Sequence, residues 1–285
     1  MANAIEYQTL MAEVLDKKLA ATSKTASMEE NAVGLIYTGG NKFQLAKMDF
    51  GSDGVSDYDR AKGYVTGSVT LEYELKQFKK DWGKKFTLDA MDVDESNYQA
   101  TMQTVMAEYV RTVEVPAVDR FRFSEIVKLA EAGTAKGAHV ETYTVAASGA
   151  LAQLRKSMSE AMTGTGLENT DLTAYVSRSY YNALIGDKDV QKVINLTGSA
   201  IALNGNTKSV DGTAIVVVDD DVLGCLYIVC ATKAPIAIAK HHVSKIFSPE
   251  QNQDADAYVG AERLYHTLEI ADNMMPTVVV VKAAG

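Results

Sequence analysis

The sequence is poor in cysteine, proline and tryptophan, and it lacks long apolar runs. Its 285 residues include two cysteines, four prolines and one tryptophan. Cys225 and Cys230 lie in one strand-like run at a spacing that points them to opposite faces of a sheet, so we expect no disulfide between them. No window approaches the roughly 18 apolar residues that a membrane span needs, and the N-terminus has no basic region before an apolar run. We therefore expect a cytoplasmic product with no membrane association.

Positive charge is scarce as well. The formal net charge is -9 and the pI is near 5.0. Proteins that hold nucleic acid by neutralising its phosphates are usually basic, so this balance argues against such a role. Hydrophobic residues make up 47% of the chain, which is ample for the core of one large domain or of two modest ones.

The longest helix-compatible segment spans residues 96–133. A capping box begins at Ser96, and Gly133 can take the left-handed conformation that ends many helices. Pro116 lacks a backbone N–H, so we expect a kink or break near Val115. At about 1.5 Å per residue an unbroken helix would exceed about 50 Å, which predicts an extended molecule.

The region before this helix predicts an arm followed by a hairpin. A short amphipathic helix over residues 4–19 precedes a polar stretch at 20–31, which we expect to be a flexible tether. Strand patterns before and after Gly40, and again up to residue 75, predict a long hairpin. Its mixed and charged faces would bury little alone, so we expect something outside the chain to cover it.

Beyond the hairpin, short strands and helices alternate. The predicted elements are a turn at 81–85, a short strand at 86–89, helices at 148–162 and 179–185, and strands at 172–176, 213–218, 225–229, 236–239 and 278–281. The late strands return to sheets begun earlier, so we expect domains that are discontinuous in sequence.

Three carboxylates raise the hypothesis of a metal-dependent enzyme. Asp219, Asp220 and Asp221 directly follow a buried strand, where catalytic carboxylates are common. The alternative that we favour is a solvated turn whose negative charge caps a helix. His241 and His242 are adjacent, so on a strand they face opposite ways, unlike two metal ligands that share a face. We expect no catalytic residues, no cofactor and no metal site.

The order of the parts resembles major capsid proteins of tailed bacteriophages, which have the Hong Kong 97-type fold. The similarity covers nearly the whole chain and is strongest at residues 86–96, 115–126 and 257–273, including VPAVDRFRFSEI and ADAYVGAERLYHTLEIADN. None of these matches is a catalytic signature. The resemblance implies an α+β fold made of an N-terminal arm (1–33), an extended β-hairpin loop (34–80), a peripheral domain (81–150 and 236–275) with the spine helix 96–133, and an axial domain (151–235 and 276–285).

The resemblance also implies a function. Copies of the chain would assemble in the host bacterial cytoplasm into the hexamers and pentamers of an icosahedral virion head, and would contact packaged double-stranded DNA non-specifically. Little sequence precedes the arm, so we expect a separate scaffolding protein, together with a portal protein. Whether decoration proteins bind the shell is left open. The residues that we expect at inter-subunit contacts are Tyr58, Arg60, Lys62, Tyr64, Trp82, Arg120 and Arg122.

Two alternatives remain beside this reading. An encapsulin-like cellular compartment would have the same fold and a protein cargo, and the metal-dependent enzyme described above belongs to a different class. Some relatives also join subunits by a Lys–Asn isopeptide bond. The chain offers candidates in Lys42, Lys47 and Lys62 and in Asn252 and Asn273, but any protein with abundant lysine offers such pairs, and we expect no crosslink.

Overall fold

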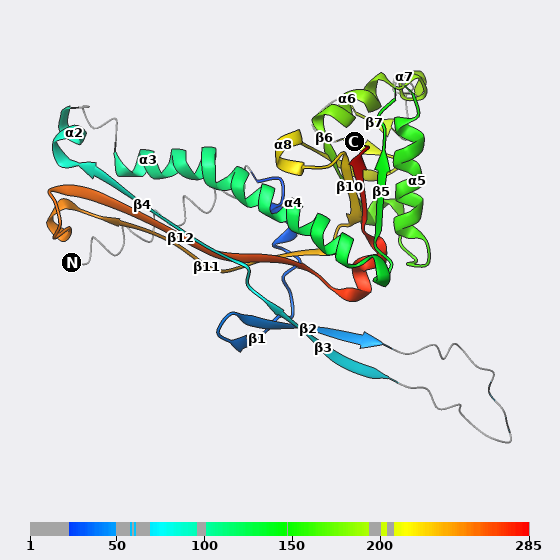
Figure 1. Ribbon diagram of the computed structural model, residues 1–285, viewed down its shortest axis with the longest axis horizontal. Helices are drawn as coiled ribbons and strands as arrows, with labels where there is room; N and C mark the ends of the chain where they lie inside the picture. Colours follow the sequence, from blue (N-terminus) through cyan, green and yellow to red (C-terminus); the bar gives the residue numbers. More distant parts are fainter. Residues whose placement is uncertain are drawn as a thin grey trace.

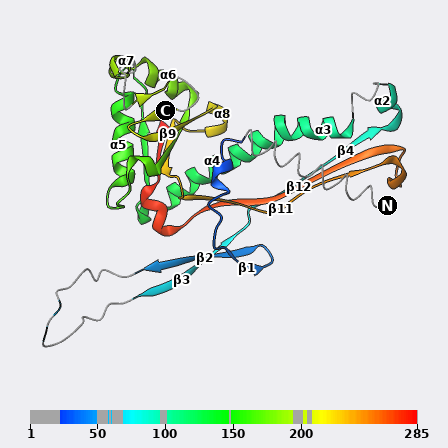
Figure 2. The same cartoon turned by 180° about the vertical axis from the view of Figure 1, so that it is seen from behind.

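A long helical rod and three long strands extend to one side of a body built from sheet and helices, and a separate hairpin leaves from beneath them (Figure 1). The structure is a computed structural model of the whole chain, and it describes residues 23–49, 58, 60, 69–95, 101–146, 148–193, 201–203 and 208–284. The described strands form three sheets, with the orders β1-β2-β3, β11-β12-β4 and β5-β13-β10-β6-β9-β8-β7. The view from behind shows the same extended outline (Figure 2).

The rod consists of α3 (Met102–Tyr109), a π-helical turn (Val110–Glu114) and α4 (Val115–Ala132). Thr101 caps α3 by accepting a hydrogen bond from the backbone N–H of Thr104. The predicted start at Ser96 lies outside the described residues. At the other end Gly133 stops the helix as predicted, but its φ of -90° is not the left-handed conformation that we expected.

We predicted a kink or break near Val115; the structure has a π turn there and no break. The N–H of Val115 donates to the carbonyl of Val110, five residues back, so the turn contains one residue more than an α-helical turn. The chain stays helical throughout, and Pro116 follows in the first turn of α4, where its missing N–H costs little. The rod is therefore continuous through this point.

The long sheet under the rod consists of β4 (Lys80–Asp89), β11 (Pro235–Phe247) and β12 (Ala257–Ile270), all antiparallel. The turn predicted at residues 81–85 is wrong, because β4 pairs with β12 without interruption from Lys80 to Asp89. That pairing outweighs the local turn signal around Gly83. The short helix α2 (Ala90–Glu95) follows β4.

A one-residue bulge decides which histidine faces the rod. Ala239 pairs with His266, but His241 pairs with Tyr265, so Lys240 is the extra residue of β11. Beyond the bulge, His242 lies on the face of the sheet that is covered by the rod. His241 lies on the opposite face and is exposed. The prediction that the two histidines face opposite ways is confirmed.

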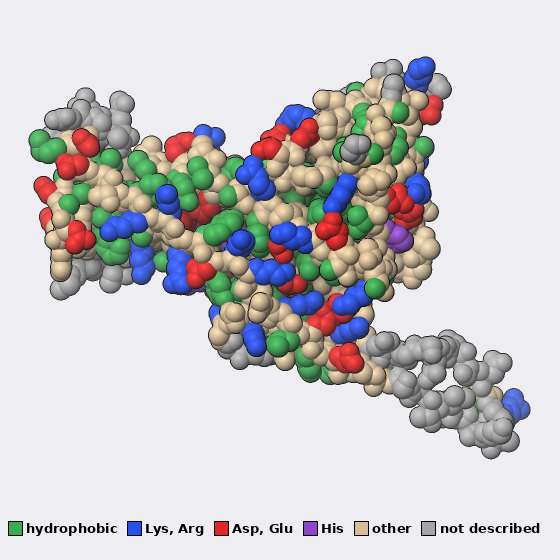
Figure 3. All heavy atoms as spheres, in the orientation of Figure 1, with side chains coloured by type: hydrophobic (Ala, Val, Ile, Leu, Met, Phe, Trp, Pro, Cys, Tyr) green, Lys and Arg blue, Asp and Glu red, His purple; other side chains and the backbone are tan. Residues whose placement is uncertain are grey.

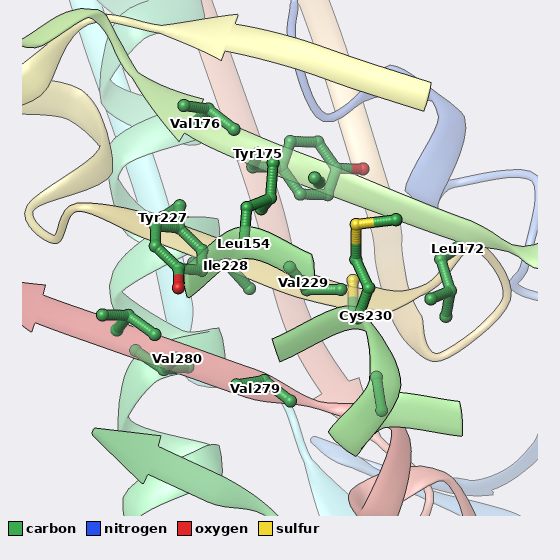
Figure 4. Close-up of a cluster of buried hydrophobic side chains, with 14 of the residues drawn as sticks. Leu154, Leu172, Tyr175, Val176, Tyr227, Ile228, Val229, Cys230, Val279 and Val280 are labelled. Atoms are coloured by element: carbon green, nitrogen blue, oxygen red, sulfur yellow. The ribbon is translucent and has the colours of Figure 1, made fainter. Parts of the chain in front are cut away.

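The main core lies in the body. Its seven strands are β5 (His139–Tyr143), β6 (Leu172–Ser177), β7 (Ile201–Ala202), β8 (Ser209–Val210), β9 (Thr213–Val218), β10 (Tyr227–Ala231) and β13 (Val279–Ala283), and its helices are α5 (Ala150–Met162), α6 (Arg178–Gly186), α7 (Lys188–Val193) and α8 (Asp220–Leu223). All six residues of β6 are buried, as expected for a strand covered on both faces. Tyr175, Tyr227 and Leu154 interdigitate there with valines of β10 and β13 (Figure 4).

The predicted elements of the body are mostly confirmed. The strand predicted at 225–229 runs instead over Tyr227–Ala231, so Cys225 lies before it. Both cysteines are free, and burial raises the pKa of each thiol to about 12. No helix in the described ranges is long and apolar enough to cross a membrane.

The first described residues pack against α4, so the flexible tether predicted at 20–31 is wrong for residues 23–31. Asp119 of α4 accepts hydrogen bonds from the hydroxyls of Ser23 and Thr25, both at 2.6 Å. Met28 is buried in the main core. The small polar residues of this segment thus serve as donors to one buried carboxylate, which holds the segment in place.

A buried histidine lies between the rod and the long sheet. His266 has no exposed surface, and its ring centroid lies 4.7 Å from that of Trp82 and 4.9 Å from that of Phe121. Burial, followed by the charge of Arg122, lowers the pKa of His266 to about 3. In the unfolded chain His266 takes up a proton near pH 6.5, whereas in the folded chain it does so only near pH 3. The stability that the neutral ring contributes above pH 6.5 is therefore lost as the pH falls from 6.5 towards 3.

We expect His266→Phe to make the unfolding free energy of the unassembled chain less sensitive to acid. Between pH 7 and pH 5 the variant should lose about 1–2 kcal/mol less unfolding free energy than the wild type, as measured by urea unfolding at each pH. His139→Gln, which changes an exposed histidine, is the control and should keep the wild-type slope. An unchanged slope in His266→Phe would contradict this assignment.

Candidate assembly interface

The hairpin sheet consists of β1 (Ile36–Gly39), β2 (Lys42–Asp49) and β3 (Thr70–Gln77). β2 pairs antiparallel with β3 along its whole length, and β1 folds back on β2 through Gly40, whose φ of +61° suits glycine. The predicted hairpin and its turn at Gly40 are confirmed. The sheet projects away from the body, beneath the long strands (Figure 1).

One face of this sheet presents apolar side chains to solvent. The alternation of β3 places every second residue on this face, and the β2 residues opposite them join it. We call it the outer face; its apolar residues, each between 45% and 54% exposed, are Ile36, Met48, Leu71, Tyr73 and Leu75. Contiguous exposed apolar surface of this kind usually marks an interaction site.

The opposite face of the sheet carries charges and is turned to the chain's own long sheet. Glu74 accepts a hydrogen bond from the backbone N–H of Asp272 at 3.1 Å. Lys76 lies 3.3 Å from the Glu74 carboxylate and 3.9 Å from that of Asp272. The usual arrangement is reversed, because along most of β3 the charged side chains face the protein and the apolar ones face water.

A small apolar cluster fastens the base of the hairpin. Phe43 and Leu45 of β2 are buried together with Phe78 and Ile238. The ring centroid of Phe78 lies 5.2 Å from that of Phe43 and 4.8 Å from that of Tyr265 on β12. These contacts fix the hairpin where it leaves the long sheet.

An ion-pair network adds to this attachment. The Nζ of Lys79 lies 3.0 Å from Glu125 of the rod and 2.8 Å from Glu269 of β12. Burial alone would lower the pKa of Lys79, but the two carboxylates outweigh it, and the pKa is raised. Lys128 also pairs with Glu125, at 3.0 Å. The direction in which the outer face points is therefore set by contacts with both the rod and the sheet.

The residues predicted at inter-subunit contacts are in different environments. Tyr58 and Arg60 are exposed, whereas Lys62 and Tyr64 lie outside the described residues. Trp82 is half-buried on β4, where its ring packs edge-on against Phe121.

Arg120 and Arg122 differ although both belong to α4. Arg120 is exposed and donates to Asp221 at 2.7 Å. The side chain of Arg122 is only 2% exposed; it donates to the hydroxyl of Thr25 at 3.0 Å and pairs with Glu29. Its partners are thus in its own chain, which corrects the expectation that Arg122 is a surface contact.

The aspartate triplet does not converge on a single point. Asp219 pairs with Arg178 at 2.7 Å, Asp220 accepts from the backbone N–H of Ser179 at 3.0 Å, and Asp221 pairs with Arg120. Three carboxylates engaged in three directions form no ion-binding site. The favoured alternative, a turn at the start of the short helix α8, matches this arrangement.

Sequence reasoning found the strands of the outer face but missed its character. The apolar residues of β3 form an alternating pattern in the sequence, but the composition of the hairpin as a whole predicts mixed and charged faces. Separating the two faces by parity would have found Leu71, Tyr73 and Leu75, whereas Ile36 and Met48 join them only through the pairing with β2.

Comparisons with known proteins establish the fold. No protein-family model and no curated protein matches the sequence. The capsid of the cyanophage P-SCSP1u matches with a TM-score of 0.65 and 12% identity, over 87% of this chain and 85% of that one. The mature capsid of bacteriophage PhiM1 gives a TM-score of 0.59 and 13% identity, over 87% and 84% of the two chains. A virus-like particle from Pyrococcus furiosus gives a TM-score of 0.59 and 14% identity, over 97% of this chain and 100% of that one. The chain has the predicted α+β fold, of the Hong Kong 97 type.

Proposed function

We propose that the chain is the major capsid protein of a tailed double-stranded DNA bacteriophage, which self-assembles into the hexamers and pentamers of an icosahedral head. The observation that carries this proposal is the outer face of the hairpin sheet. A sheet with charged residues toward its own chain and apolar residues toward water needs a second surface to cover it, and a neighbouring copy of the chain would supply one. The fold shared with phage capsids supports that choice of partner.

The three sheets suggest how the chain is divided into the regions of a capsid subunit. In this proposal residues 1–33 are the arm, the hairpin sheet is the extended loop, the long sheet with its rod is the peripheral domain, and the seven-stranded body is the axial domain. Because β5 pairs with β13, we place the first boundary between these two domains before His139 rather than at residue 150.

The surface of the molecule supports contacts beyond the hairpin. Hydrophobic side chains also lie along the rod and long strands, between acidic and basic groups (Figure 3). We propose Tyr58, Arg60 and Arg120 as inter-subunit contacts, because all three are exposed. A scaffolding protein, a portal protein and packaged DNA complete the proposed set of partners, in a head assembled in the cytoplasm of the host.

Electron microscopy tests the proposal directly. The purified chain, alone and together with the proposed scaffolding protein, should form shells of uniform diameter in negative stain. A chain that stays monomeric at high concentration under both conditions would rule out the proposed function.

A cellular compartment shell is the second candidate. It is favoured by the virus-like particle from Pyrococcus furiosus, which matches this chain over its own entire length. The contents of shells isolated from the natural source distinguish the two: nuclease-protected double-stranded DNA indicates a phage head, and a packaged protein indicates a compartment.

A further inference from the structure

We propose that Glu114, His242 and Glu262 bind a divalent transition-metal ion, of which Zn²⁺ is the representative, between the rod and the long sheet. The Nε2 of His242 lies 2.9 Å from the Oε1 of Glu262 and 3.6 Å from the Oε1 of Glu114. One ligand atom from each residue lies within 4.8 Å of the other two. Within the described part of the chain no other set of three such residues comes together in this way.

The spacing of these atoms suits an ion. Ligand atoms at zinc–ligand distances in a tetrahedral site are about 3.3 Å apart, and the two distances measured from the histidine fall on either side of this value. The donors are one imidazole and two carboxylates, without a thiolate. Calcium and magnesium prefer oxygen ligands alone, whereas imidazole favours zinc and its neighbours in the first transition series.

Burial of the two carboxylates favours a cation at this point. Glu114 and Glu262 are each only 5% exposed, and two neighbouring carboxylates in such surroundings are costly without a compensating charge. The Oε2 of Glu262 is buried and accepts no hydrogen bond from any described residue. A divalent ion bound here would carry enough positive charge to balance both carboxylates.

The cluster is also accessible. A cavity of about 360 Å³ lies against it, and Glu114 and Glu262 are both in its lining, together with Tyr109 and Lys84. Lys84 is exposed, so the cavity reaches the surface there. The cavity offers a path for an ion and room for the water that completes a four-coordinate site.

Two backbone irregularities bring the ligands together. Glu114 is the last residue of the π turn, and His242 faces the rod only because Lys240 bulges out of β11. A regular strand would present His241 instead. π turns and β-bulges are both frequent at functional sites, and here one of each meets at the same cluster. An ion bound there fastens the rod to the sheet.

The test is direct measurement of bound metal. The unassembled full-length chain is dialysed against ZnCl₂ and then against metal-free buffer, and its zinc content is determined by mass spectrometry. We expect one Zn²⁺ per chain in the wild type. Binding should fall at least about tenfold in His242→Ala and in Glu262→Gln, and stay at the wild-type level in His241→Ala, which removes the exposed neighbour.

Cobalt provides a second measurement. Co²⁺ bound to the wild type should give the visible absorption of a four-coordinate site, and this absorption should be missing in a folded His242→Ala variant, its fold checked by circular dichroism. A wild-type chain that retains no more zinc than a blank, or His242→Ala with undiminished binding, would overturn the proposal. The wild-type result needs no variant to fold and no shell to assemble, so it is independent of the proposed function.

Discussion

Replacing Leu71 and Leu75 with glutamate should weaken shell assembly and leave the subunit folded. Both side chains are about half exposed on the outer face, and burying the remainder of a leucine stabilises a contact by about 1 kcal/mol. The double variant loses this contribution twice in every copy of the chain and adds two carboxylates that a contact would have to desolvate. We expect the protein concentration needed for assembly, measured by light scattering and electron microscopy, to rise at least about tenfold.

The control for this experiment uses the same two positions. Leu71→Met with Leu75→Met keeps the outer face apolar at similar volume, and it should assemble near the wild-type concentration. Urea unfolding of the unassembled chain should be close to wild type for both double variants, because these side chains face solvent. Assembly of the glutamate variant at the wild-type concentration would show that the outer face is not a contact surface.

The hairpin illustrates what sequence can and cannot predict. Alternation and glycine turns are local signals, and they predicted the strands and the turn at Gly40 correctly. The direction of each face is set by residues far away in the chain, since Glu74 meets Asp272 and Lys79 meets Glu125 and Glu269. No local pattern contains that information.

The same limit explains the errors along the rod and the long sheet. Residues 81–85 resemble a turn locally, but β12 supplies a partner for every one of them. Residues 23–31 resemble a tether because they are small and polar, and their partner Asp119 lies far along the chain. The missing N–H of Pro116 is a local fact, but the break that it could cause does not occur, because Pro116 lies in the first turn of α4 and the chain stays helical through a π turn.

The Glu114–His242–Glu262 cluster could not have been predicted. The adjacency of His241 and His242 correctly predicts that they do not share a face. The cluster uses only one of them, and its other two members come from the rod and from β12. Their meeting depends on a π turn and a bulge, which shift the register of each element by one residue and leave no distinct sequence pattern.

Replacing Arg122 with alanine should cause a large loss of stability in the subunit. The guanidinium is buried, donates to the hydroxyl of Thr25 and pairs with Glu29, while the same hydroxyl donates to Asp119. Without the arginine, the carboxylate of Asp119 stays buried next to a disrupted network. The side chain of Glu29 is 45% exposed, so its pair with the arginine contributes little, and the cost comes from the lost hydrogen bonds of the buried guanidinium. We expect a loss of about 2–3 kcal/mol in urea unfolding of the unassembled chain at pH 7.

Arg120→Ala is the matched control for this prediction, two positions earlier on the same helix. Its ion pair with Asp221 is exposed on both sides, so its loss should cost less than about 1 kcal/mol. Hydrogen exchange adds a spatial readout, because amides of residues 23–29 should lose protection in Arg122→Ala and keep it in Arg120→Ala. Equal effects of the two variants would mean that the buried network does not hold this segment. A large difference would locate the attachment of the N-terminal region at α4, next to the strands from which the hairpin leaves.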